Sequence, residues 1–265
     1  MKKEATMDLA GPCGFDTLFR RSLPHILENI FLSLDYESLK TCYHVSNQWK
    51  EFITSDYFKG KARQQFSSDI EDDEMSLSEA SNLGNADEVR SLLSYGLVDV
   101  NYVGWIHVRT ALHEASERGH NDVVKVLLDQ GADPNIVDEE YGKNPLHLAA
   151  VSNHKDVART LLDKGAAPNK EDENRETPLH LAAYKGLNDI VKILLDGGAD
   201  PNKTGEHVGT PLLFAVRGGQ KEVVQTLVDA GADPNKKANK QEFSPLGKAR
   251  QCRYSEMVKI LEDAG

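Results

Sequence analysis

A short phrase recurs four times in this chain at an almost constant interval. Successive copies begin 34, 33 and 33 residues apart, and each is followed by an apolar run and a glycine-containing turn. A fixed period of this size indicates a stacked array, because one such unit cannot bury its own apolar face. The copies are Thr110–Ser116 (TALHEAS), Asn144–Ala150 (NPLHLAA), Thr177–Ala183 (TPLHLAA) and Thr210–Val216 (TPLLFAV).

The copy that begins at Thr177 shows how a unit is expected to fold. The Thr177 hydroxyl can cap a short helix whose first residue is Pro178, where the missing N–H costs nothing. A longer second helix follows Gly186, and Gly198 is the expected left-handed terminator. The sequence therefore predicts helix, helix and turn in each unit. The apolar positions of the second helix are Ile190, Val191, Leu194 and Leu195.

These phrases resemble the ankyrin repeat, whose signature is T-P-L-H-x-A at a period of 33. The resemblance covers residues 77–265 and implies an all-α solenoid of about six units, four of them unambiguous. Leu77–Asn101 is a degenerate first copy, and Ser244 opens a degenerate last one. Degenerate ends suit an array, because its terminal units face water on one side.

Composition narrows the classes of function. The formal net charge of −11 and the sequence pI of about 5.3 argue against nucleic acid as the main ligand. Three cysteines, Cys13, Cys42 and Cys252, lie far apart and fit a reducing compartment without disulfides or a zinc site. The first twenty residues hold no secretion-type apolar stretch, and no apolar run reaches membrane-spanning length. We therefore expect a cytoplasmic or nuclear protein without a membrane partner.

The repeated histidines invite a catalytic or metal-binding interpretation. His113, His147 and His180 are one period apart and so occupy the same position in successive units. The alternative, which we favour, is that each ring forms hydrogen bonds near the helix start and the adjoining turn. No acidic residue or cysteine stands at ligand spacing, and no serine or cysteine lies in a nucleophile motif. The sequence thus predicts no catalytic residue, no metal site and no cofactor.

Residues 23–66 do not follow the period, and residues 1–22 before them are predicted to be flexible. Several short helices are expected in this segment, and Asp35 is a plausible cap for the one that contains Leu39. About 40 residues make little core by themselves, yet large apolar side chains are abundant here. Some of these side chains are expected to face a partner.

This segment contains, in order, Leu23-Pro24, Ile30-Phe31, Leu34, Leu39, Val45 and Trp49. That order resembles an F-box. The resemblance implies docking on the Skp-type adaptor of a cullin-based ubiquitin ligase, although the Leu-Pro pair lies one residue closer to Ile30 than is common. The alternative is a helical cap that shields the first unit of the array. The implied partner-binding residues are Leu23, Pro24, Ile26, Leu27, Ile30, Phe31, Leu34, Leu39, Val45 and Trp49.

Residues 67–76 separate the two parts and are predicted to form an acidic, solvated linker that charge repulsion keeps extended. Ser68 precedes Glu71 by three residues, a pattern that suits an acid-directed kinase, although a plain spacer is the simpler interpretation.

Ankyrin-type units present turn tips and first helices on one concave side, so a target is expected there. The positions on that side are comparatively basic for an acidic chain, which predicts an acidic or phosphorylated target segment. Ordinary solvated surface is the alternative, because Glu139, Glu140, Glu173 and Glu176 dilute the basic patch. The predicted substrate-binding residues are Trp105, His107, Arg109, Arg118, Tyr141, Lys143, Arg175, Tyr184, Lys185, His207 and Arg217.

Together these features predict a non-catalytic adaptor, the substrate-recognition subunit of an SCF-type ubiquitin ligase. Its helical segment would dock the Skp-type adaptor and cullin complex, and its array would hold the protein substrate. Such a subunit acts by proximity, because it raises the effective concentration of substrate lysines near the ubiquitin carrier. The alternative is an ankyrin scaffold or inhibitor without a ligase role.

Overall fold

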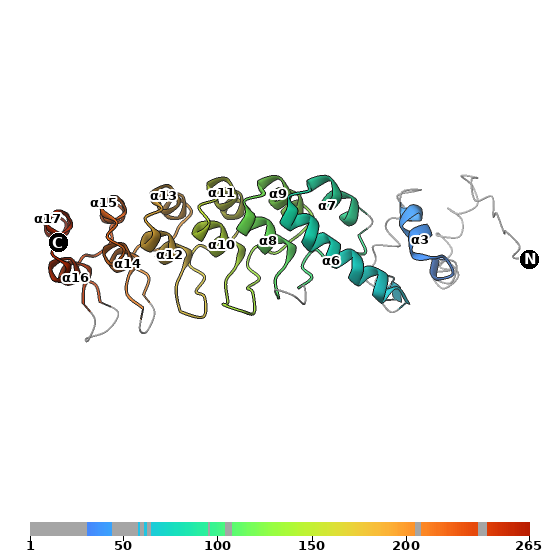
Figure 1. Cartoon of the computed structure of the whole chain (residues 1–265), viewed down its shortest axis with the longest axis horizontal. Helices are drawn as coiled ribbons and strands as arrows, with labels where there is room; N and C mark the ends of the chain where they lie inside the picture. Colours follow the sequence, from blue (N-terminus) through green and yellow to red (C-terminus); the bar gives the residue numbers. More distant parts are fainter. Residues whose placement is uncertain are drawn as a thin grey trace, which may run out of the picture. The chain divides into compact units, whose positions relative to one another are not determined.

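The computed structural model describes residues 31–43, 58, 61–62, 65–94, 96–103, 108–204, 208–237 and 243–265 (Figure 1). Within these ranges the chain forms thirteen helices and no strand, so the predicted all-α class is confirmed. The chain divides into two compact units, Met1–Asp73 with Ser94–Val98, and Glu74–Leu93 with Asp99–Gly265. The second unit is the array.

Two rows of helices build the array, and an inner and an outer helix alternate along the sequence. Inner helices contact the inner helices of adjacent repeats, and outer helices contact outer ones, so each repeat packs on its neighbours. The loops that join each outer helix to the next inner helix, such as residues 130–144 and 164–177, are here called fingers, and they project beyond the inner row on the side away from the outer row (Figure 1). The inner row after the first repeat is α8 (Ala111–Arg118), α10 (Pro145–Val151), α12 (Pro178–Lys185), α14 (Pro211–Arg217) and α16 (Pro245–Cys252).

The outer row completes six helix pairs, which confirms the predicted solenoid of about six units. Its helices are α7 (Ala86–Leu93), α9 (Asn121–Asp129), α11 (Lys155–Asp163), α13 (Asn188–Asp196), α15 (Lys221–Asp229) and α17 (Ser255–Asp263).

Apolar residues at helical spacing form the core of each repeat. In the fourth repeat Leu179 on α12 is completely buried, as are Ile190, Val191 and Leu194 on α13. Gly198 has φ +88°, as a left-handed terminator requires. The sequence therefore predicted this repeat correctly, including its turn.

The first pair departs from the others because its inner helix is much longer. Helix α6 (Ser67–Leu83) spans 17 residues, so the prediction of an extended linker over 67–76 is wrong. Ile70 and Leu77 are buried seven residues apart on one helical face, together with Glu74. Most of the other acidic side chains of α6 are exposed to water, so their mutual repulsion does not prevent the helix from forming. Ser68 is exposed in the first turn of α6.

The first unit has a small core of its own. Helix α3 (Tyr36–Tyr43) begins after Asp35, which accepts a 2.7 Å hydrogen bond from the Ser38 backbone N–H and caps the helix as predicted. That bond lowers the pKa of Asp35. The Tyr36 hydroxyl donates to Asp73 at 2.9 Å, and Lys40 forms an ion pair with Asp73 at 2.7 Å. The core side chains are Phe31, Leu39, Phe58, Phe66 and Ile70.

The repeated histidines are structural, as the sequence analysis favoured. In the second repeat His113 Nδ1 accepts the Thr110 backbone N–H at 3.2 Å and lies 2.8 Å from the Thr110 hydroxyl. Nδ1 is therefore unprotonated, and Nε2 donates across the repeat boundary to the Lys143 carbonyl at 3.0 Å. Each histidine ring therefore links the capping residue of its own helix to the finger of the next repeat. Burial lowers the pKa of His113, and likewise of His147 and His180, to about 4.

The residue that caps the inner helix of the third repeat is Asn144, whereas the second and fourth repeats have threonine there. The hydrogen bonds between this cap and its histidine are less well matched. Asn144 Oδ1 accepts the His147 N–H at 3.1 Å but also lies 2.6 Å from Nδ1, itself an acceptor. Asn144 Nδ2 is buried and has no hydrogen-bond partner within the described part of the chain. We expect Asn144→Thr to raise the free energy of unfolding by about 1 kcal/mol, because a hydroxyl can donate to Nδ1.

Urea denaturation of Asn144→Thr beside wild type measures this difference. Thr177→Asn is the matched control and should lower the free energy of unfolding by a similar amount. An Asn144→Thr variant no more stable than wild type would contradict the proposed mismatch.

Candidate protein-binding surface

The fingers are held rigidly at their bases. Asp138 Oδ1 accepts backbone N–H groups of Tyr141 and Lys143, each at 3.0 Å. Adjacent fingers also share backbone hydrogen bonds, from Glu139 to the Val108 carbonyl at 3.4 Å and from Glu173 to the Tyr141 carbonyl at 2.9 Å. These bonds give the side chains beside the inner row a fixed frame, as a preorganised binding surface needs.

The two helix rows differ sharply in charge. Helices α10, α12, α14 and α16 contain no aspartate or glutamate. Every outer helix from α9 to α17 carries at least two carboxylates. On a chain with a net charge of −11, this makes the inner row from α10 to α16 a basic strip, whereas α8 carries Glu114 and Glu117. The cations of this strip are Lys185, Arg217, Lys248 and Arg250.

An aromatic cluster lies within this basic strip, and we name it the Phe214 cluster after its central residue. The Tyr184 ring meets the Phe214 ring edge-on, with centroids 6.4 Å apart. The Arg217 guanidinium carbon lies 5.8 Å from the centroid of Phe214. Phe214 also packs edge-on against the buried ring of His180 at 5.1 Å, which anchors the cluster to the core. The Phe214 cluster is Tyr184, Phe214 and Arg217.

Sequence reasoning found Tyr184 and Arg217 but missed Phe214. Phe214 occupies the position of Leu148 and Leu181 in other copies of the phrase, and so resembles ordinary core. The available signal was the departure of TPLLFAV from TPLHLAA at three positions, of which Leu213 and Phe214 are adjacent.

Arg109 was predicted to contact a substrate, and the structure instead makes it an internal ion bridge. Its guanidinium pairs with Glu117 at 2.9 Å and, through Nε, with Asp138 at 3.4 Å. Only 13% of the Arg109 side chain is exposed, and that of Asp138 is fully buried. The guanidinium is thus committed to neighbouring repeats, because it neutralises a buried carboxylate.

Two other predicted cations lie at the surface and have partners in the preceding repeat. Arg118 is exposed and donates to Asn82 Oδ1 at 2.9 Å, and Lys185 donates to the Val151 carbonyl at 3.1 Å. Two further cations lie on the fingers. Arg175 forms an ion pair with Glu171 at 2.9 Å, and Lys143 Nζ lies 5.0 Å from the centroid of the exposed Tyr141 ring. Trp105, His107 and His207 lie outside the described residues.

The F-box residues are described only in part. Phe31 and Leu39 are buried, and the Phe31 ring packs edge-on against Phe58 at 5.9 Å. Both were named as partner-binding residues, and in the structure both side chains contribute to the core of the first unit. Leu34 is half-buried. Leu23, Pro24, Ile26, Leu27, Ile30, Val45 and Trp49 lie outside the described residues.

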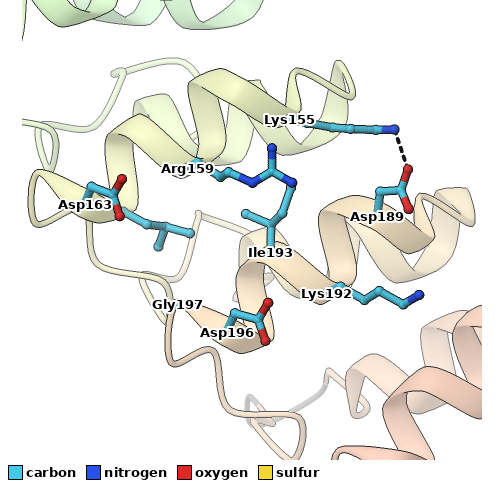
Figure 2. A pocket seen from close by; sticks show the side chains of 9 residues that line it. Lys155, Arg159, Asp163, Asp189, Lys192, Ile193, Asp196 and Gly197 are labelled. Atoms are coloured by element: carbon cyan, nitrogen blue, oxygen red, sulfur yellow. Dashed lines mark hydrogen bonds and ion pairs between the residues drawn. The ribbon is translucent and has the colours of Figure 1, made fainter.

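The outer row has a groove of about 580 Å³ between α11 and α13 (Figure 2). Lys155 and Asp189 form an ion pair at one end, and Asp163 and Asp196 lie toward the other. Gly197 lies in the lining at the position that Lys164 occupies one repeat earlier, where Lys164 pairs with Asp129 at 2.8 Å. The lining of the groove contains three cations and three carboxylates, so its formal charges cancel. They are Lys155, Arg159, Lys192, Asp163, Asp189 and Asp196.

No helix in the described segments has the length and apolar character that a membrane crossing demands. No group of three histidine, cysteine or acidic side chains in those segments could hold a metal ion.

Comparison with known families agrees with this geometry. A model of ankyrin repeats in three copies matches residues 54–138 and 130–205, and a single ankyrin-repeat model matches 209–239. The chain belongs to the ankyrin-repeat family. The match begins at residue 54, whereas the sequence analysis placed the first repeat at residue 77.

The chain is also similar to short stretches of curated plant proteins. It is 50% identical over 48 residues to the regulatory protein NPR6 of Arabidopsis thaliana, which is 18% of this chain and 10% of the relative. Identity to the BTB/POZ domain and ankyrin repeat-containing protein NBCL of Lotus japonicus is 48%, with the same shares. Regulatory protein NPR5 of A. thaliana is 40% identical over 65 residues, or 24% and 13% of the two chains. The matches span only about a tenth of these relatives.

Proposed function

We propose that this chain is a non-catalytic adaptor that holds a protein partner on its array and presents that partner to a ubiquitin ligase. The single observation that carries the first half is the repeat array itself, since stacked ankyrin repeats imply protein partners. The basic strip and the rigid finger bases give the array a surface on which a partner segment would lie. The cytoplasm or nucleus is the proposed compartment.

The ligase half of the proposal rests on the order of apolar residues in 23–66, which resembles an F-box. Burial of five leucine or isoleucine side chains would contribute roughly 8–15 kcal/mol, at about 1.5–3 kcal/mol each. Association costs on the order of 4–15 kcal/mol. Docking on the Skp-type adaptor and cullin complex would therefore need polar contacts in addition to the apolar face.

A second candidate function is a scaffold or inhibitor without a ligase role. Burial of Phe31 and Leu39 favours it, because side chains that form a core are not free to dock on an adaptor. Under this alternative the first unit is a helical cap, and the array alone binds a partner.

Binding of the full chain to a purified Skp-type adaptor separates the two candidates. We expect calorimetry to detect a complex, and Leu27→Asp with Ile30→Asp to weaken it at least a hundredfold, because two charges would have to be buried. Leu83→Asp is the control, since Leu83 is 68% exposed on α6, and should bind as wild type does.

Circular dichroism should show unchanged melting of the array in all of these proteins. Absence of a wild-type complex, or a complex that survives both aspartate substitutions, would leave the scaffold as the better reading.

A further inference from the structure

We propose that the Phe214 cluster anchors an extended, carboxylate-rich peptide segment of the partner through one large apolar side chain. The inference rests on the proposed function only in that the array binds a protein segment, and it does not depend on the ligase role. The apolar side chain lies against the aromatic rings, and neighbouring carboxylates of the segment face the cations of the inner row.

The apolar half of this site is an exposed aromatic edge. Tyr184 is 54% exposed, and no other large apolar side chain on α8, α10, α12, α14 or α16 is exposed among the residues that the structure describes. Its ring meets Phe214, which is half-buried and backed by His180. Aromatic residues on a rigid support are the usual energetic anchors of interfaces, so these five inner helices offer one evident anchor point.

Contacts to the Tyr184 carbonyl hold the end of α12 close to the turn after α14. The Gln220 side-chain amide lies 3.4 Å from the Tyr184 carbonyl and 2.8 Å from the Gly218 carbonyl, and it donates to both. A Cβ at Gly218 would lie 2.3 Å from that same Tyr184 carbonyl, so glycine permits this close approach of α12 and the turn after α14. The cluster is therefore preorganised, which reduces the entropy lost on binding.

The charge of the inner row selects the partner. Four successive inner helices without a carboxylate lie on a strongly acidic chain, and Lys185 and Arg217 flank the aromatic edge on α12 and α14. The outer helices α11, α13 and α15 each carry two carboxylates and are neutral or net acidic once their lysines and arginines are counted, so they offer the same segment no net attraction. A negatively charged segment is thus guided to the inner row rather than to the outer one.

The spacing of the cations favours carboxylates over a phosphate. The cations lie on three different helices, and Arg250 already forms an ion pair with Glu262 at 2.7 Å. A phosphate group is typically bound by several donors that converge on its oxygens. Cations spread over neighbouring repeats match carboxylates spread along an extended chain.

Selection from a displayed library of random twelve-residue peptides, with the full chain immobilised, tests the proposal. The library contains no phosphate, so we expect enriched peptides with several aspartates or glutamates and one phenylalanine, tryptophan or leucine. Fluorescence polarisation of the best peptide should show at least tenfold weaker binding to Tyr184→Ala and to Arg217→Glu.

Arg159→Glu is the matched control, because it makes the same charge change on the outer row, where 59% of the Arg159 side chain is exposed. It should change the dissociation constant less than twofold, and circular dichroism should show all three variants folded. No enrichment, enrichment without acidic residues, or equal losses for Arg159→Glu and Arg217→Glu would overturn the proposal. Binding of the Skp-type adaptor to the same preparations reports the ligase role separately, so either idea can fail without the other.

Discussion

Acidification from pH 7 to pH 4.5 is expected to destabilise the array by on the order of 5 kcal/mol, through three buried histidines. His113, His147 and His180 have pKa values lowered by burial to about 4, against an ordinary value of 6.5. In each histidine, Nδ1 accepts a hydrogen bond from a backbone N–H, so protonation of Nδ1 would place two N–H groups face to face. The histidines of the unfolded chain lack this repulsion, so as the pH falls they bind protons before those of the folded chain.

The direction of the effect follows from the depressed pKa values. Stability from these histidines is complete above pH 6.5 and is lost as the pH falls toward 4, because only the unfolded state gains protons in that window. Each histidine contributes at most about 1.4 kcal/mol per pH unit. Urea denaturation at half-unit pH steps measures the slope.

A single substitution identifies the source of the slope. His180→Leu introduces the residue that the fifth repeat already carries at the same position, Leu213. The variant should be less stable at pH 7, because it loses the 2.9 Å hydrogen bond to the Gly209 carbonyl. Its stability should nevertheless fall about a third less steeply between pH 6.5 and 4. An unchanged slope would mean that the buried histidines do not carry the acid sensitivity.

The sequence was sufficient for features that repeat and insufficient for features that occur once. Thr177, Gly186 and Gly198 predicted the cap and the turns of a repeat, because the same local geometry is imposed at every copy. The acidic composition of residues 67–76 predicted an extended linker, although the helical spacing of Ile70 and Leu77 indicated the helix α6. A long helix can bury one narrow face and hold its carboxylates in water.

Side-chain partners across repeats were the harder part of the candidate site. Whether an arginine on a finger faces a ligand or a neighbouring repeat depends on a residue about thirty positions away. Arg109 and Arg118 look alike in the sequence, yet the first bridges Glu117 and Asp138 and the second lies at the surface. The Phe214 cluster likewise combines residues of two repeats.

Arg109→Ala is expected to lower the free energy of unfolding by about 3 kcal/mol, because it leaves a buried carboxylate without its cation. The Asp138 side chain is fully buried, and Oδ1 is occupied by two backbone N–H groups, so Oδ2 depends on Arg109. Arg118→Ala removes the same charge nine residues away, at an exposed position with one hydrogen bond to Asn82. It should cost less than about 1 kcal/mol.

A second substitution distinguishes loss of the ion pair from loss of packing. Asp138→Asn keeps an oxygen for the two backbone N–H groups and removes the charge, so Arg109→Ala with Asp138→Asn should recover much of the lost stability. Urea denaturation of the two single variants and the double variant gives the coupling between the residues. Equal losses for Arg109→Ala and Arg118→Ala, with no recovery in the double variant, would contradict the internal bridge. Arg109 would then be interpreted as a partner-binding residue, as its position in the sequence predicted.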